Sequence, residues 1–300
     1  MLKIAYHPLY AHPLPEGHRF PMLKYELIPA QLLHEGTITQ ENLFAPEPLA
    51  EENIITTHDA TYWLQLKNLT LSAKEQRRIG FPLTAQLVER EIRIAQGTID
   101  GAKFAQQLGV SFNVAGGTHH AGSNWGEGFC LLNDQAIAAN YLLSNSLAKR
   151  ILIIDLDVHQ GNGTAEIFQN EARVFTFSIH GDKNFPFRKE LSDLDIPLED
   201  GTGDDAFLSK LSDGLTFVFT KHQPDFVFYL AGVDVLESDK LGKLALTKNA
   251  CKQRDLMVFE ACLKHQVPLQ VSMGGGYSED IKVIVDAHCN TFRLAADLYS

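Results

Sequence analysis

The sequence predicts one α/β domain of three layers over residues 1–300, with a largely parallel central sheet covered by helices on both faces. Short apolar runs rich in β-branched residues, such as 151–154 (ILII), are typical of strands buried on both faces of a parallel sheet. Longer segments with helical spacing of apolar residues alternate with these runs, which is the pattern of strand–helix–strand units. Because no linker, repeat or low-complexity stretch separates them, we expect one domain and not two.

The first third of the chain is expected to mix strands, loops and helices. The segment 2–6 (LKIAY) indicates a first strand, and 7–20, rich in Pro, His and Gly, indicates a loop. A helix expected over 22–35 should kink or break at Pro29, and its apolar residues recur at Leu23, Leu27, Ala30 and Leu33. The remaining elements expected here are a short strand at 53–57, a helix from the N-cap Asp59 to Leu66, a polar loop at 67–82, and a helix at 84–108 with Gly97 as a point of interruption.

Beyond residue 110, strands and helices alternate regularly. Apolar runs predict strands at 111–115, 150–156, 173–179, 224–231 and 267–273. Helices are expected at 134–147, at 204–222 with Asp204 or Asp205 near the N-terminus, and around 248–264 and 279–298. This alternation is the main support for a parallel sheet.

The composition is that of an ordinary globular protein, with 45% hydrophobic and 21% charged residues. With 26 basic and 37 acidic residues the net charge is −11, and no Lys/Arg run supplies the basic face of a nucleic-acid binder. Such a balance would attract cationic peptides or polyamines weakly. The four cysteines form no CxxC pair. The first residues read as a strand and not as a signal peptide. No apolar run approaches the roughly 20 residues that span a bilayer. We therefore expect a cytoplasmic protein without a membrane span.

The segment 151–163 (ILIIDLDVHQGNG) carries the first chemical signal. Residues two apart in an extended segment project to the same side, so Asp157 and His159 can aim at one point past the strand end, with Asp155 behind them. A carboxylate and an imidazole at one point indicate a divalent metal. A salt-bridged strand end or a helix N-cap is the simpler alternative.

Three other expected strands end in unusual residues. Gly116-Gly117-Thr118 leads to His119 and His120, which are suited to proton transfer near neutral pH, although a pair of surface histidines would look the same. Asp234 follows the strand at 224–231 and would most often be a helix N-cap. Tyr277 follows three glycines, a pattern that alone is a weak turn or phosphate-loop signal.

Taken together, these strand ends predict one site, because ligands bind outside the carboxyl ends of parallel strands. Asp157, His159 and Asp234 would form a three-ligand metal site with an open position for water, as in catalytic zinc sites. The two adjacent histidines would transfer protons, and the hydroxyl of Tyr277 would donate to a developing oxyanion.

These motifs resemble a known family. DLDVHQGNG, GGTHHAGSNWGEGFC, AGVDVLESDKLGKL and GGGY are similar to the histone deacetylase superfamily, which includes acetylpolyamine amidohydrolases and shares the arginase-like α/β fold. The resemblance runs from about His18 to Tyr277. HRFPMLKYELI near the start and KQRDLMVF after the third motif look most like class IV histone deacetylases.

The resemblance implies roles for individual residues. Zinc would be bound by Asp157, His159 and Asp234, and Tyr277 would polarise the amide carbonyl. The acyl-lysine channel would involve Gly128, Phe129, Phe185 as an opposite wall, and Gly275. A structural potassium ion would use Asp155, Ser178 and the backbone carbonyls of Asp157, His159 and Ile179.

The resemblance also separates the two histidines. Asp155 matches the carboxylate partner of His119, whereas the partner of His120 is Asn162, where some classes carry Asp. A carboxylate raises the pKa of an imidazole far more than an amide does. The hypothesis is that His119 is cationic and that His120 is neutral and acts as general base and then acid.

The predicted function is a zinc-dependent amidohydrolase that removes acetyl or longer fatty acyl groups from the ε-amine of lysine in peptides or proteins, with Fe²⁺ or Co²⁺ as alternatives to zinc. The alternative substrates are acetylpolyamines or other small acylated amines. A non-catalytic acyl-lysine binder is the third reading, which the filled catalytic positions disfavour. The class IV resemblance indicates that long acyl chains are removed better than acetyl.

Overall fold

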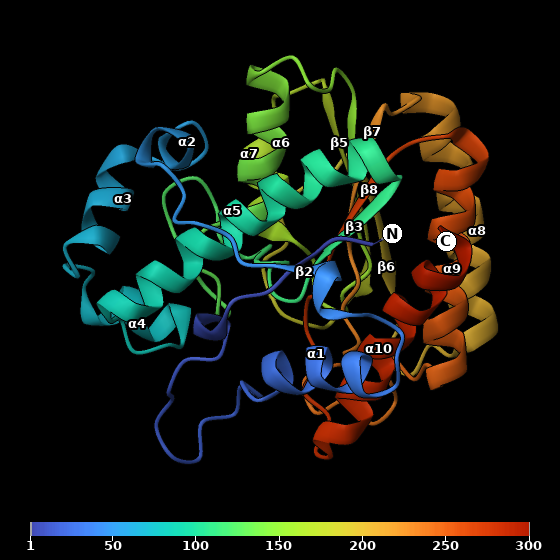
Figure 1. Ribbon diagram of the computed structural model, residues 1–300, viewed down its shortest axis with the longest axis horizontal. Coiled ribbons are helices and arrows are strands. Elements are labelled where there is room, and N and C mark those ends of the chain that lie inside the picture. The colour runs from blue at the N-terminus through green and yellow to red at the C-terminus, as the bar shows by residue number, and fades with distance from the viewer. Residues whose placement is uncertain (1, 300) are drawn as a thin grey trace.

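An eight-stranded sheet forms the centre of the protein, and every neighbouring pair of strands in it is parallel (Figure 1). The computed structural model describes residues 2–299. The strands lie in the order β2-β1-β3-β8-β7-β4-β5-β6. Their bounds are β1 Ile4–Ala5, β2 Leu43–Phe44, β3 Val110–Asn113, β4 Ile151–Asp155, β5 Val174–Gly181, β6 Leu194–Leu198, β7 Phe226–Leu230 and β8 Leu269–Ser272. The α/β class and the parallel sheet are thus confirmed.

Helices cover both faces of the sheet. The long helix α5 (Ala85–Leu108) packs on β3 and β8 and against α6 (Asp134–Ser144). Figure 1 shows a second group together on one side of the strands, in which α9 packs between α8 and α10, and α1 packs on α10. The bounds of the other helices are α1 Lys24–His34, α2 Glu51–Ile55, α3 Ala60–Lys67, α4 Ala73–Ile79, α7 Asn162–Phe168, α8 Asp204–His222, α9 Lys248–His265 and α10 Ile281–Leu298, with 3₁₀ turns at Pro8–Tyr10 and Gln40–Asn42.

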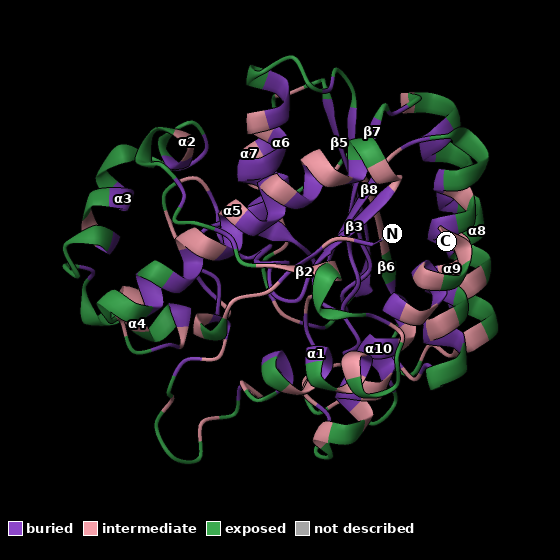
Figure 2. Cartoon of the chain, viewed as in Figure 1, coloured by how far each residue is buried: buried purple, intermediate pink, exposed green. Residues whose placement is uncertain are grey.

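Burial follows the layers. The central strands β3, β4, β7 and β8 are buried along their whole length, whereas the outer surfaces of the helices are exposed (Figure 2). This is why β4 and β7 read as nearly continuous apolar runs in the sequence, whereas β3 (VSFN) and β8 (LQVS) alternate apolar with buried polar residues. The edge strands β2 and β6 are only partly buried, and β6 contains Pro197, which edge strands tolerate. Neither edge strand was predicted.

Two local predictions were wrong. The segment expected as a strand at 53–57 overlaps α2, a short helix in which only Ile54 is buried and which begins with two glutamates that favour a helix N-terminus. The expected polar loop at 67–82 contains α4. That helix begins with a capping box between Ser72 and Glu75 and ends at Gly80 with φ +86°, both of which are helix signals that the sequence carried.

The helix predicted over 22–35 is continuous across Pro29, so no break occurs there. It also buries a different face from the one expected, because Leu23 is 50% exposed whereas Lys24 is fully buried. Similarly, α5 is not interrupted at Gly97. A Cβ there would lie 2.7 Å from the Tyr10 hydroxyl, so the glycine serves close packing. Asp59 caps α3 as predicted, by accepting hydrogen bonds from two backbone N–H groups.

Candidate metal centre and active site

Four loops meet at one edge of the sheet. They follow β3, β8, β7 and β4, which are consecutive neighbours. Because all pairs are parallel, the four carboxyl ends lie at the same edge, where ligands of such sheets bind. The loops carry the predicted site residues His119 and His120 after β3, Tyr277 after β8, Asp234 after β7, and Asp157 and His159 after β4.

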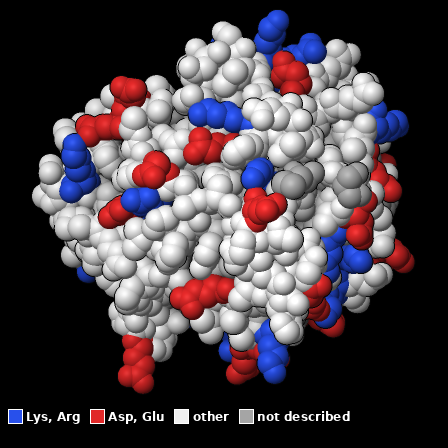
Figure 3. Space-filling view, in the orientation of Figure 1, with Lys and Arg blue, Asp and Glu red and all other residues white. Residues whose placement is uncertain are grey.

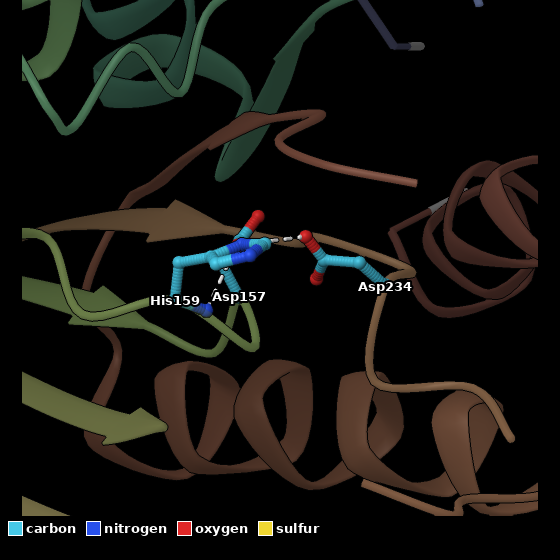
Figure 4. Close-up of side chains that lie close together, drawn as sticks. All are labelled: Asp157, His159 and Asp234. Atoms are coloured by element: carbon cyan, nitrogen blue, oxygen red, sulfur yellow. Dashed lines mark hydrogen bonds and ion pairs between the residues drawn. The ribbon is translucent and has the colours of Figure 1, made fainter. Parts of the chain in front are cut away.

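Asp157, His159 and Asp234 form a buried group at this edge (Figure 4). Each offers one ligand atom, and the three atoms lie within 4.8 Å of one another. Nδ1 of His159 is 2.9 Å from Oδ1 of Asp157 and 3.2 Å from Oδ2 of Asp234. Two carboxylates and one imidazole at this spacing could bind a divalent metal ion.

One oxygen of this group lacks a hydrogen bond. Oδ1 of Asp234 accepts from the backbone N–H of Val158 at 2.9 Å, but the buried Oδ2 has only the ion-pair contact with His159 at 3.2 Å and accepts no hydrogen bond from the described residues. Gly275 supports the group: its N–H donates to Oδ2 of Asp157 at 2.8 Å, and a Cβ there would lie 2.0 Å from Oδ2 of Asp234. Because an orphaned buried carboxylate oxygen is costly, the residues present fit a bound cation.

The pKa shifts within this group also favour a bound cation. Burial alone would lower the pKa of His159, but its close contacts with the two carboxylates and their negative charge raise it to about 10. Burial, followed by the charge of Asp157, raises the pKa of Asp234 to about 7. Both directions show a demand for positive charge at this point, which a divalent ion would meet in place of the proton.

His119 lies between two carboxylates. Its Nδ1 is 2.7 Å from Oδ2 of Asp155, and its Nε2 is 3.9 Å from Oδ1 of Asp157. Burial lowers the pKa of this imidazole, but the two carboxylates outweigh that effect and raise the pKa above its ordinary value. His119 therefore favours the protonated form.

His120 has an amide as its partner. Its Nδ1 is 2.7 Å from Oδ1 of Asn162, an oxygen that can only accept, so Nδ1 carries the proton and Nε2 of the neutral ring is free. Glu127 fixes the direction of that amide, because its Oε1 accepts from Nδ2 of Asn162 at 2.6 Å. Its other oxygen pairs with Nε of Arg78 at 2.5 Å. A chain of contacts thus runs from His120 to the protein surface.

The two adjacent histidines differ in charge. Burial, followed by the charges of His119 and His159, lowers the pKa of His120 well below its ordinary value. The directions match the sequence hypothesis of a cationic His119 beside a neutral His120. Their rings are 4.1 Å apart, so the cation itself contributes to keeping its neighbour neutral.

Tyr277 borders the metal group from the loop after β8. Its backbone N–H donates to Oδ2 of Asp239 at 2.6 Å, and its ring centre is 6.4 Å from that of His159. Burial, followed by the charges of Asp157 and Asp234, raises the pKa of its phenol well above the ordinary value. The hydroxyl is therefore a neutral hydrogen-bond donor.

A fully buried lysine contacts the same loop. Nζ of Lys24, in the first turn of α1, donates to the carbonyl of Gly274 at 2.9 Å. The ammonium also lies 5.9 Å from the ring centre of Tyr277 and 5.4 Å from that of Tyr25, which are cation–π distances. Burial lowers the pKa of this lysine to about 8.

A cavity of about 410 Å³ opens onto the site. Its lining includes His120, His159 and Tyr277 and three of the four residues predicted to bind substrate, Gly128, Phe129 and Phe185. Gly128 has φ +55°, and a Cβ there would lie 2.7 Å from Cδ2 of His120, so glycine permits the close approach. The fourth residue, Gly275, contacts the two carboxylates of the metal group and is not part of this lining.

The residues predicted to hold potassium lie on β4, on β5 and in the loop after β4. Asp155 is the register partner of Ser178, whose Oγ is 2.9 Å from Nδ1 of His180. Oδ1 of Asp155 accepts from the N–H of Asp157 at 3.2 Å. Both side chains thus have protein partners, and the potassium site with the carbonyls of Asp157, His159 and Ile179 stays a prediction.

Three residues of this site were missed from the sequence, namely Lys24, Glu127 and Asp239. Each looks like an ordinary surface charge in a linear reading. The only signal was position: Lys24 lies inside HRFPMLKYELI, Glu127 inside GEGFC and Asp239 inside ESDK, all within the motifs that carried the resemblance. Their roles depend on contacts between residues far apart in the sequence.

Comparison with known proteins identifies the family of this chain. The histone deacetylase domain model matches residues 18–292, so the chain belongs to the histone deacetylase family. An uncharacterized protein of Picosynechococcus sp. is 44% identical over 296 residues, which cover 99% of each chain. Histone deacetylase 2 of Arabidopsis thaliana is 28% identical over 287 residues, which cover 92% of this chain and 74% of that protein.

Solved structures show the same fold. A crystal structure of a histone deacetylase homologue in complex with SAHA matches with a TM-score of 0.83 at 25% identity, covering 99% of this chain and 84% of the other. The homologue from Aquifex aeolicus matches with a TM-score of 0.80 at 24% identity and the same coverage. Family and fold together support a hydrolytic deacetylase. None of the helices within residues 2–299 is long and apolar enough to cross a membrane.

Proposed function

We propose that the chain is a zinc-dependent amidohydrolase that removes acyl groups from the ε-amine of lysine in peptides or proteins. The observation that carries this proposal is the orphaned Oδ2 of Asp234 within a buried Asp/His/Asp group beside the cavity. Asp157, His159 and Asp234 would hold the ion, with Fe²⁺ or Co²⁺ as alternatives. When bound, zinc would polarise the acyl carbonyl and lower the pKa of a water molecule toward about 7.

The proton transfers fall to the histidine pair. Nε2 of neutral His120 takes the proton of the attacking water, because its Nδ1 proton is held by Asn162. The imidazolium then gives this proton to the departing amine, which leaves a carboxylate and a free amine as products. His119 stays protonated beside Asp155 and contributes a fixed positive charge. If His120→Ala kept near wild-type turnover while His119→Ala lost it, these roles would be reversed.

Tyr277 is expected to donate its phenolic hydrogen to the oxyanion. Losing one such donor costs on the order of 10²–10³ in rate. Tyr277→Phe should therefore lower kcat by about that factor and leave the thermal unfolding midpoint close to wild type. Steady-state kinetics and a melting curve on the same preparation check this, and a kcat within about twofold of wild type would contradict the role.

The metal requirement is tested by chelation. Turnover of an acyl-lysine peptide should disappear after the protein is treated with a chelator and return on addition of Zn²⁺, with Fe²⁺ and Co²⁺ tested alongside. Full activity in the metal-free protein would overturn the proposal. A protein that binds acyl-lysine peptides but hydrolyses no acyl-amide in any metal would be the non-catalytic binder instead.

Two finer proposals follow the class IV resemblance and the cysteines. A panel of lysine peptides carrying acetyl to myristoyl groups should show better turnover of long chains, and equal or better turnover of acetyl would contradict this. The main alternative, an acetylpolyamine amidohydrolase, predicts that acetylspermidine is the better substrate.

We also propose a cytoplasmic location, since all four cysteines are free and buried.

A further inference from the structure

The mouth of the cavity is basic, although the protein as a whole is acidic. Five of the residues that line the cavity are Lys or Arg, and none is Asp or Glu. We call Arg19, Arg77, Arg78, Lys183 and Lys243 the basic rim. All five are exposed. In a chain of net charge −11, this concentration of one sign at the entrance runs against the overall balance.

The basic rim comes from segments far apart in the sequence. Arg19 precedes α1, Arg77 and Arg78 lie in the last turn of α4, Lys183 follows β5, and Lys243 precedes α9. Charges from four separate segments therefore surround one opening. The face of the molecule seen in Figure 3, in contrast, carries acidic and basic side chains interspersed.

Acidic partners neutralise only part of the basic rim. Arg78 pairs with Glu127 at 2.5 Å, and Nζ of Lys243 is 3.8 Å from Oδ2 of Asp200. Within residues 2–299, Arg19, Arg77 and Lys183 form no ion pair with a carboxylate.

The surroundings of the three unpaired cations leave them available to a ligand. The guanidinium of Arg19 instead lies 5.1 Å from the ring centre of Phe129, a wall of the cavity. The one acidic neighbour of Lys183 in sequence, Asp182, accepts at its carbonyl from the ammonium of Lys189, which adds a further cation nearby. Three uncompensated positive charges therefore face whatever enters the cavity.

We propose that the basic rim selects acyl-lysines flanked by acidic residues, so that the substrate is a peptide or protein segment rich in Asp and Glu around the acylated lysine. This inference rests on the proposed deacylase function and narrows its substrate class. Carboxylates next to the acyl-lysine would lie over Arg19, Arg77 and Lys183 and be attracted by them. Polyamines and Lys/Arg-rich tails meet repulsion at the same place, so like-charge exclusion supplies the other half of the specificity.

The first experiment uses three peptides with the same central acyl-lysine and flanking residues that are acidic, neutral or basic. One exposed ion pair changes binding about twofold to fivefold, so three uncompensated cations predict at least about a tenfold higher kcat/KM for the acidic than for the basic peptide. The preference should shrink as salt is raised from about 0.01 to 1 M, because screening shortens the reach of exposed charges. Equal kcat/KM for the three peptides, or a preference for the basic one or for acetylspermidine, would overturn the proposal.

Charge reversal then assigns the preference to the basic rim. Arg77→Glu and Lys183→Glu should each reduce the acidic-to-basic ratio of kcat/KM severalfold, and the double variant should abolish or invert it. Both peptides are assayed with the same preparation of each variant, so any inactive, misfolded fraction lowers both kcat/KM values equally and cancels in their ratio. Lys210→Glu, the same charge change on the exposed surface of α8, is the matched control and should keep the wild-type ratio. An unchanged ratio in the double variant would also refute the inference.

A binding measurement separates this inference from the proposed function. Calorimetric titration of the three peptides reports their affinity without turnover. Tighter binding of the acidic peptide with no hydrolysis of any peptide would retain the selectivity and refute the deacylase function. Hydrolysis of all three peptides at equal rates and affinities would retain the function and refute the selectivity.

Discussion

His119 and His120 are adjacent in the chain, yet the groups opposite their Nδ1 atoms give them different charge states. Nδ1 of His119 contacts the carboxylate of Asp155, whereas Nδ1 of His120 contacts the amide oxygen of Asn162. The structure also explains why an amide suits position 162 in this chain. Its Nδ2 donates to Glu127 at 2.6 Å, a contact that a carboxylate at the same place could not make.

The first prediction follows from this contact. Asn162→Asp should lower the free energy of unfolding by roughly 2 kcal/mol or more, because it sets two buried carboxylates against each other, and should also reduce kcat. Adding Glu127→Gln should restore most of the lost stability, since the new amide can donate to the new carboxylate. Chemical denaturation of the two single variants and the double variant gives the coupling energy. Strictly additive effects would show that Glu127 does not position Asn162.

At the scale of elements, the sequence predicted the helices and the strands that are buried along their whole length. The strands β4 and β7 are buried on both faces and therefore read as unbroken apolar runs. The helices α8 and α9 were placed within one residue of their observed ends. The edge strand β6 was missed because half-exposed edges carry polar residues and a proline.

The site residues also divide into those that the sequence could predict and those that it could not. Asp157, His159 and Asp234 could be placed together because each follows a strand of a parallel sheet, and such strands share one edge. Lys24 could not be found, because α1 was expected to bury the face of Leu23 and instead buries a cation. A buried charge serves a partner elsewhere in the chain, and here that partner, Gly274, is 250 residues away.

The second prediction concerns how α1 supports the active-site loop. Lys24→Met keeps an unbranched side chain, one heavy atom shorter, but removes the donor to the Gly274 carbonyl. Removing a buried charge offsets the lost hydrogen bond, so the free energy of unfolding should change by less than about 1 kcal/mol. Because Tyr277 lies three residues further along the same loop, kcat should fall by roughly tenfold or more. A large loss of stability with kcat unchanged would show that Lys24 serves the fold alone.

At the scale of the whole molecule, charge is arranged by location. The surface carries the excess of acid, the cavity mouth carries uncompensated bases, and the interior holds several histidines that folding keeps neutral. Burial lowers the pKa of His12 and of His58 to about 4 in each case. Burial raises the pKa of the buried Glu91 to about 7. Its effect on the pH dependence of stability is therefore opposite to that of the two histidines, because the folded state takes up this proton more readily than the unfolded chain.

The last prediction is that His58 makes the fold sensitive to acid. This fully buried imidazole joins three segments: Nδ1 donates to the carbonyl of Gly122 at 2.9 Å, and Nε2 accepts from the N–H of Asn133 at 2.9 Å. Protonation would place a second N–H against that backbone donor. Because the folded pKa of about 4 lies below the unfolded value of about 6.5, the stability that His58 contributes is complete above pH about 6.5 and is lost as the pH falls toward 4.

His58→Gln isolates this effect, because the glutamine amide offers an N–H donor group and an acceptor oxygen in place of the two ring nitrogens but does not titrate. Between pH about 6.5 and 4 the wild type should lose as much as roughly 3 kcal/mol more unfolding free energy than the variant, since one pKa unit corresponds to about 1.4 kcal/mol. Denaturant titrations of both proteins across this range measure the difference, and the contributions of His12 and Glu91 cancel in it. Parallel stability curves would mean that His58 is accommodated in its protonated form.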